Sequence, residues 1–227
     1  MSLGGGSFFK EQVMKKNYTH IVMIVDKSGS MTPLRKETIE NFNKFLNEQQ
    51  AVKAEATFSL VLFDTEYRFL YTNVDLQKVK PLTMGEYDPS GYTALLDATG
   101  AAIDETGSFL KNLKEEERPE KVVIVTITDG EENSSFLYTK EAIKAKVKLQ
   151  SDVYKWQFVF LGANIDAYAE AGALGYSSST TANYSANAFG TMSAYAGTSS
   201  KLAAFRSNVV NTMEFTDKEK DDIEKPK

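Results

Sequence analysis

Unbroken apolar runs alternate with segments of helically spaced apolar residues along most of the chain. The runs cover residues 20–25, 57–63, 121–127 and 156–161. Helical spacing is found in segments 33–50, 93–113 and 139–154. Segment 166–174 is expected to be a short helix, and the Ala/Gly/Ser-rich segment 188–205 the last helix. A continuous apolar run is typical of a strand that is buried on both faces, as in a parallel sheet covered by helices. The alternation therefore predicts a doubly wound α/β domain with helices on both faces of its sheet.

Two further segments complete the predicted sheet. Segment 67–72 follows the strand at 57–63 after only three residues, and this link is too short for a parallel crossover. The pair is therefore expected to be an antiparallel hairpin with 67–72 at an edge. A polar segment at 179–185 is a weak last strand. The prediction is a six-stranded, mostly parallel sheet with one antiparallel edge strand.

The pattern assigns one domain to residues 17–207. Residues 1–16 are Gly-rich and then polar, and we interpret them as an N-terminal leader that partly derives from an expression tag. Residues 208–227 form a charged C-terminal tail, expected to be disordered from Asp217 onward. Inside the domain, Thr32 is expected to cap a helix whose first residue is Pro33.

Composition narrows the possible functions. The 227 residues are 42% hydrophobic, which is enough for a substantial core. The sequence has no cysteine, and His20 is its only histidine. Disulfides, cysteine nucleophiles, Cys/His zinc sites and nearly all histidine-based catalytic triads are therefore excluded.

The charge distribution and the start of the chain bear on partners and location. Basic and acidic residues number 26 and 31 and are mixed along the chain, so no basic footprint for nucleic acid is present. No apolar run approaches the ~18 residues that a membrane helix needs, and the start lacks the pattern of a secretory signal. We therefore expect a soluble, cytoplasmic protein that binds neither nucleic acid nor membrane. The oligomeric state does not follow from the sequence.

Two of the apolar runs end at an aspartate that is followed by small residues. Run 20–25 leads into Asp26, and run 121–127 leads through Thr128 into Asp129. Doubly wound domains bind ligands beyond the C-terminal strand ends, where the strand order reverses. If the two strands are neighbours there, both carboxylates face one crevice, and nearby hydroxyls complete a half-shell of oxygens. The candidate ligands are Asp26, Ser28, Ser30, Thr93 and Asp129.

The donor types indicate which ion would bind. Mg²⁺ takes about six hard oxygens in octahedral geometry and commonly keeps some waters. Ca²⁺ usually takes 6–8 oxygens with bidentate carboxylates, which three short hydroxyl side chains supply poorly. Mg²⁺ or Mn²⁺ is therefore the expected cofactor. Five side chains leave one coordination position for water or for an oxygen of a partner.

The segments that carry these residues resemble the three motifs of a von Willebrand factor type A domain. They read Asp26-Lys-Ser-Gly-Ser, Gly91-Tyr-Thr-Ala-Leu-Leu-Asp-Ala and Ile127-Thr-Asp-Gly-Glu. The resemblance extends from about Tyr18 to Arg206. It implies a metal-ion-dependent adhesion site in which no ligand position departs from the family pattern. It also implies the strand order 3-2-1-4-5-6 and metal-dependent binding of a protein partner that offers an Asp or Glu carboxylate.

Simpler interpretations of the same residues stay open. Asp26, Ser28 and Ser30 are also typical of a polar turn that caps a helix, and Thr93 could serve only as a helix cap. His20 lies at the strand entrance, far from the site, and is assigned no role. Glu131 and Glu132 are expected to belong to a solvated loop.

Three functions remain in competition. The leading hypothesis is a binding module that captures a partner carboxylate through its metal. The second is a scaffold whose metal is purely structural. The third is a Mg²⁺-dependent phosphoryl-transfer enzyme. The enzyme is disfavoured because Ser28 stands where aspartyl-phosphate phosphatases carry their second aspartate, and the chain has no nucleotide-binding G-x-x-x-x-G-K-[ST] loop.

Overall fold

A single mixed sheet forms the centre of the molecule. The computed structural model describes residues 14–225. The strands are β1 (Lys15–Asp26), β2 (Glu55–Phe63), β3 (Tyr67–Asp75), β4 (Pro119–Thr128), β5 (Gln157–Ala163) and β6 (Thr181–Tyr184). Their order is β3-β2-β1-β4-β5-β6, and every neighbouring pair is parallel except β2 and β3. The predicted sheet, its antiparallel edge strand and its strand order are confirmed.

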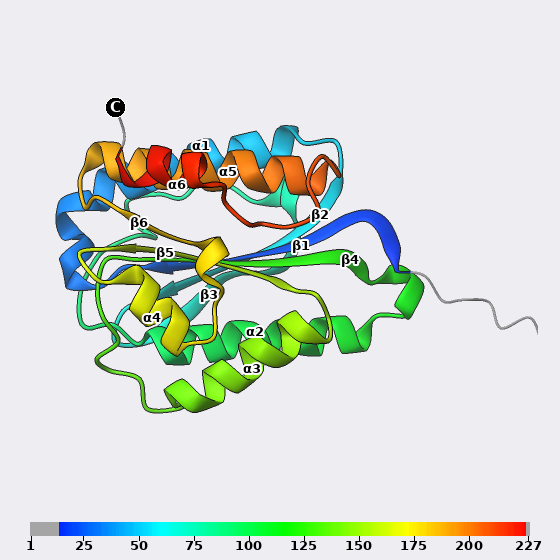
Figure 1. Cartoon of the computed structure of the whole chain (residues 1–227), viewed down its shortest axis with the longest axis horizontal. Coiled ribbons are helices and arrows are strands. Elements are labelled where there is room, and N and C mark those ends of the chain that lie inside the picture. Colours follow the sequence, from blue (N-terminus) through cyan, green and yellow to red (C-terminus); the bar gives the residue numbers. More distant parts are fainter. Residues whose placement is uncertain (1–13, 226–227) are drawn as a thin grey trace, which may run out of the picture.

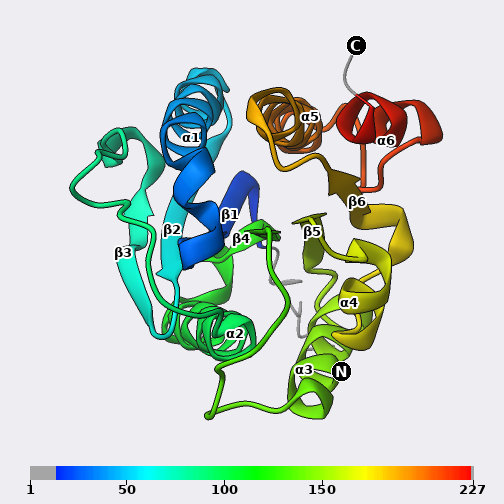
Figure 2. The same ribbon diagram turned by 90° about the vertical axis from the view of Figure 1, so that its left-hand side faces the viewer.

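Helices cover both faces of this sheet. They are α1 (Arg35–Ala51), α2 (Leu95–Asn112), α3 (Lys140–Asp152), α4 (Ala167–Ala173), α5 (Ala188–Arg206) and α6 (Asp217–Glu224). Helices α1, α5 and α6 lie on one face, and α2, α3 and α4 lie on the other (Figure 1). The end-on view shows the resulting three layers (Figure 2). No helix of residues 14–225 is long and apolar enough to cross a membrane.

Strand β1 explains why the apolar runs are unbroken. Its residues Ile21, Met23 and Val25 belong to the core on the α1 and α5 side, whereas Val22 and Ile24 belong to the core on the α2 and α3 side. All five side chains are fully buried. Successive residues of a strand point to opposite faces, so a strand with two covered faces needs apolar residues at every position.

The helix after β1 begins later than predicted. Segment Gly29–Leu34 forms a 3₁₀ helix that contains Pro33, and α1 starts at Arg35. The Thr32 hydroxyl donates to Gly29 O at 2.7 Å, and α1 has no side-chain cap, so the predicted cap was wrong. The chain turns tightly right after β1, and i→i+3 hydrogen bonds keep this first turn in 3₁₀ geometry.

Residues 217–225 of the charged C-terminal segment are folded, and the prediction of disorder was wrong for them; residues 226 and 227 lie outside the described residues. Helix α6 begins with a capping box, in which Thr216 and Glu219 satisfy each other's backbone N–H groups. Phe215 is 6% exposed and Ile223 only 1%. A well-capped helix with apolar side chains at suitable positions thus packs against the domain, despite its charged composition.

The predicted leader lies mostly outside the described residues, because the description begins at Met14. Strand β1 starts at Lys15, two positions before the predicted start of the domain. The predicted domain bounds are not otherwise tested.

Candidate metal centre

Three loops at the C-terminal end of the sheet are joined by backbone hydrogen bonds. Gly29 N, in the loop after β1, donates to Gly91 O at 3.1 Å. Asn133 N, in the loop after β4, donates to Thr93 O at 3.1 Å, and Thr93 N donates to Asn133 Oδ1 at 2.9 Å. Gly91 has φ +69°, a conformation that side-chain-bearing residues rarely adopt. The loops therefore form one continuous rim, with the candidate ligands distributed over all three.

Four of the five candidate ligands form a chain of hydrogen bonds across this rim. Asp26 Oδ1 accepts from Ser28 N at 2.7 Å, and Ser28 Oγ lies 3.0 Å from Ser30 Oγ. Ser30 Oγ donates to Asp129 Oδ1 at 2.6 Å. Asp26, Ser28 and Asp129 are buried, whereas Ser30 is exposed. The group is therefore accessible from the Ser30 side.

Thr93 joins the group through Gly130. A Cβ atom placed on Gly130 would lie 3.4 Å from Thr93 Oγ1 and 3.7 Å from Ser30 Oγ, so both hydroxyls lie close to this glycine. Helix α2 begins at Leu95 with no side-chain cap, which means that the Thr93 hydroxyl does not cap it. All five predicted ligands therefore converge, and the simpler interpretation of Thr93 as a helix cap was wrong. Their role in binding a metal stays a prediction.

The two carboxyl groups sit in an environment that disfavours their negative charge. Burial raises the pKa of Asp26 to about 6, although hydrogen bonds from Thr128 and Ser28 partly oppose this effect. Burial also raises the pKa of Asp129. Within residues 14–225 neither carboxylate pairs with a basic side chain, and the nearby Lys27 pairs with Asp64 instead. A bound cation would supply the missing positive charge.

Sequence reasoning missed two residues that hold Asp26 in place. Thr128 Oγ1 donates to Asp26 Oδ2 at 2.5 Å, and Tyr87 Oη donates to Asp26 O at 2.5 Å. Thr128 could have been found, because it ends the neighbouring strand, directly before Asp129. Tyr87 carried no signal, since it lies in a polar connection far from any motif.

Two buried or half-buried carboxylates organise the loop after β4. Glu132 accepts hydrogen bonds from the backbone N–H groups of Leu96, Ser134 and Ser135. Asp97, which is 2% exposed, accepts from the backbone N–H groups of residues 136–138. The expectation of a solvated loop fits the exposed Glu131 but was wrong for Glu132. The hydrogen bond between Glu132 and the backbone of Leu96 in α2 cannot be predicted from the sequence.

The donor set fits a small hard cation. Among residues 14–225 no group of three or more His, Cys, Asp or Glu side chains could hold a metal ion. The convergent set instead consists of two carboxylates and three hydroxyls, all of which are hard oxygen donors. These residues suit a divalent cation when solvent or a partner supplies the remaining coordination.

The fold and this set of oxygens define a doubly wound α/β domain with a candidate metal centre at the C-terminal rim of its sheet. The profile of the von Willebrand factor type A domain matches residues 20–194. The chain belongs to this family. A comparison with curated protein sequences gave no match.

Solved structures with the same fold include metal-loaded proteins. The von Willebrand factor type A protein from Catenulispora acidiphila is 16% identical, with a TM-score of 0.56, over 82% of this chain and 43% of that one. The manganese-loaded TRAP protein of Plasmodium vivax is 19% identical, with a TM-score of 0.54, over 75% and 70%. Proximal thread matrix protein 1 of the mussel byssus, with a zinc-occupied MIDAS motif, is 14% identical, with a TM-score of 0.51, over 87% and 45%. The chain thus spans less than half the length of the first and third, and identities this low show a shared fold.

Proposed function

We propose that this chain is a metal-dependent protein-binding module, in which Mg²⁺ or Mn²⁺ at the rim captures an Asp or Glu carboxylate of a partner protein. The observation that carries the proposal is the convergence of five oxygen-bearing side chains around two carboxylates that no basic side chain of residues 14–225 neutralises. Family membership supports it, because domains of this family that have a metal-ion-dependent adhesion site are metal-dependent adhesion modules.

The five residues contribute either negative charge or neutral oxygen ligands to the proposed site. Asp26 and Asp129 supply two negative charges, and Ser28, Ser30 and Thr93 supply neutral oxygens. The ion, when bound, provides a positive charge and an open coordination position for a carboxylate oxygen. The two carboxylates balance the two positive charges of the ion. The centre is then approximately neutral, so it can bind a further carboxylate without strong repulsion.

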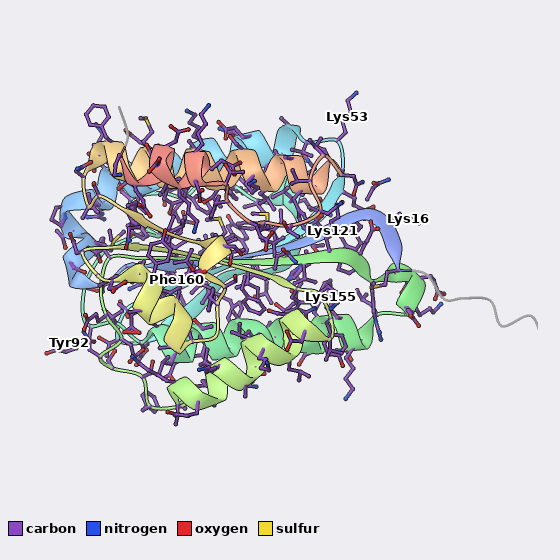
Figure 3. All side chains as sticks on the ribbon, in the orientation of Figure 1. Lys16, Lys53, Tyr92, Lys121, Lys155 and Phe160 are labelled. Carbon is purple, nitrogen blue, oxygen red and sulfur yellow. The ribbon has the colours of Figure 1, made fainter. Side chains whose placement is uncertain are left out.

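The rim around the centre presents apolar side chains to a partner. Tyr92, the neighbour of Thr93, is 67% exposed, and Phe136 in the loop after β4 is 78% exposed. Figure 3 shows Tyr92 at the end of the molecule opposite Lys16 and Lys53. The proposed interface therefore combines one charged contact at the metal with apolar contacts from the surrounding loops.

The proposal assigns no catalytic role to the site. The one histidine of the sequence, His20, lies in the middle of β1, six positions before Asp26, which ends that strand. The Ser28 and Ser30 hydroxyls are hydrogen-bonded to each other and, from Ser30, to Asp129, and no histidine among residues 14–225 is placed to activate them.

Selection of binding peptides tests the proposal without a known partner. A random displayed peptide library would be panned on the protein in Mg²⁺, and the selected peptides would be tested again in chelator. We expect binders that contain an essential Asp or Glu and that dissociate in chelator. The Ser28→Ala variant should lose them, while Ser207→Ala, an exposed serine at the opposite end of the domain, should bind as the wild type does. Binders that tolerate both chelator and Ser28→Ala would favour a purely structural metal.

A further inference from the structure

Three buried tyrosines lie beneath the candidate metal centre, and we call them the tyrosine cluster: Tyr87, Tyr184 and Tyr195. They come from separate parts of the chain, namely the β3–α2 connection, the end of β6 and the middle of α5. Their exposed fractions are 0%, 4% and 2%. All three belong to the core on the α1 and α5 side of the sheet.

Two members of the cluster bind the backbone where the central strands end. Tyr87 Oη donates to Asp26 O at 2.5 Å, and Tyr184 Oη donates to Thr128 O at 3.4 Å. Asp26 ends β1 and Thr128 ends β4. The paired register of these two strands stops one residue earlier in each, at Val25 and Ile127. Asp26 is still paired with Phe63 of β2, and Thr128 with Gly162 of β5. The tyrosines therefore add hydrogen bonds to the two strand ends at the point where pairing between β1 and β4 has stopped.

We infer that Tyr87 and Tyr184 are positioning residues of the metal centre, which fix the orientation of the Asp26 and Asp129 carboxylates by holding the adjoining strand-end carbonyls. The inference rests on the proposed metal site. Mg²⁺ and Mn²⁺ sites depend on accurate ligand geometry, and loss of an outer partner commonly weakens metal binding about 10–100-fold. Burial raises the pKa of both phenols well above the usual value, so each hydroxyl stays protonated and able to donate.

Tyr195 provides a matched control within the same cluster. Its hydroxyl is buried and has no hydrogen-bond partner among residues 14–225, and its ring packs edge-on against Phe45 with the ring centroids 6.5 Å apart. Removal of this hydroxyl deletes no contact with the strand ends. The Tyr195→Phe variant therefore changes the same kind of side chain in the same core without the proposed effect.

The test is Mn²⁺ titration of the wild type and of the Tyr87→Phe, Tyr184→Phe, Tyr195→Phe and Asp26→Ala variants by calorimetry, together with the electron paramagnetic resonance spectrum of the bound ion. Tyr87→Phe should weaken Mn²⁺ binding about tenfold and change the spectrum. Tyr184→Phe should have a smaller effect, because its hydrogen bond is longer, and Tyr195→Phe should match the wild type. Thermal unfolding without metal separates this role from a purely structural one. If the tyrosines are purely structural, their substitution should lower the unfolding temperature and leave both the Mn²⁺ affinity and the spectrum unchanged.

The outcomes separate the inference from the proposed function. If Asp26→Ala abolishes binding but Tyr87→Phe and Tyr184→Phe bind Mn²⁺ with wild-type affinity and spectrum, the positioning role is wrong and the site stands. If the wild type binds no Mn²⁺, or Asp26→Ala binds it equally well, the proposed site fails and the inference fails with it.

Discussion

Individual oxygen donors at the rim differ in how well the sequence reveals them. Asp26, Ser28 and Ser30 were recognisable because they alternate from the last residue of a buried strand onward, and Asp129 because it directly follows a second one. Tyr87, which holds Asp26, and Glu132, which anchors the loop after β4, were not recognisable, because both act through contacts between distant segments. Local spacing predicts ligands on one loop, whereas the support of a ligand depends on which segments the fold brings together.

His20 was assigned no role, and the structure makes it a buried polar residue. Its Nδ1 lies 2.9 Å from Thr57 Oγ1, its ring packs 5.2 Å from that of Phe109, and Nε2 has no hydrogen-bond partner among residues 14–225. Burial lowers the pKa of His20 from 6.5 to about 3. The unfolded chain thus binds a proton below about pH 6.5 that the folded protein excludes until about pH 3.

This difference predicts a loss of stability in acid. The contribution of the neutral ring is complete above pH 6.5 and falls as the pH is lowered toward 3, by about 5 kcal/mol in total. Chemical denaturation in chelator should show that the free energy of unfolding falls more steeply with decreasing pH in the wild type than in His20→Gln. Asp26, whose raised pKa has the opposite effect, is present in both proteins and cancels. A difference that does not depend on pH would contradict the prediction.

Glu132 and Glu131 form a matched pair for testing the loop after β4. Glu132→Gln keeps the shape of the side chain but leaves one acceptor oxygen for four donors, so we expect a loss of about 1–2 kcal/mol in the free energy of unfolding. Hydrogen exchange of residues 134–138 should also accelerate. Glu131→Gln, at an exposed position, should change neither quantity. Equal effects of the two substitutions would refute the anchoring role of Glu132.

At the scale of secondary structure elements, the strands were more predictable than the helix ends. Unbroken apolar runs identified the buried strands, and a three-residue link identified the antiparallel edge. The sequence misplaced the start of α1 because the 3₁₀ turn depends on how the loop after β1 is held. It missed α6 because the charged composition of this segment is typical of disorder, and its few apolar side chains become buried only when the helix packs against the domain.

The packing of α6 on α5 depends on a small residue. A Cβ atom on Gly197 of α5 would lie 2.8 Å from Ile223 Cγ1 of α6, which is too close without movement of that side chain. Gly197→Ala should therefore loosen α6, with faster hydrogen exchange in residues 217–224. In Gly107→Ala on α2 a Cβ atom meets nothing within 4 Å, so we expect about 0.5–1 kcal/mol of stabilisation from the better helix former. Unchanged exchange in α6 of Gly197→Ala would show that Ile223 is not the contact that holds the helix.

At the scale of the whole molecule, two cores hold the sheet from opposite faces and leave its C-terminal end for the loops that carry the site. The sequence predicted this arrangement because the buried runs indicate a doubly wound sheet and the resemblance to the family implies its strand order. The rigidity of the rim was not predictable, since it arises from hydrogen bonds between three loops. A rim that is already joined in this way can present metal ligands with little rearrangement.

The most direct test of the account is calorimetric titration of the metal-free protein with Mn²⁺. The wild type should bind one ion, Asp26→Asn and Thr93→Val should each bind it more than about tenfold more weakly, and Thr72→Val, at an exposed position of β3, should bind as the wild type does. Far-ultraviolet circular dichroism should show the same fold in all four proteins. Absence of Mn²⁺ binding by the wild type, or undiminished affinity in both Asp26→Asn and Thr93→Val, would contradict the assignment of a metal centre to Asp26, Ser28, Ser30, Thr93 and Asp129.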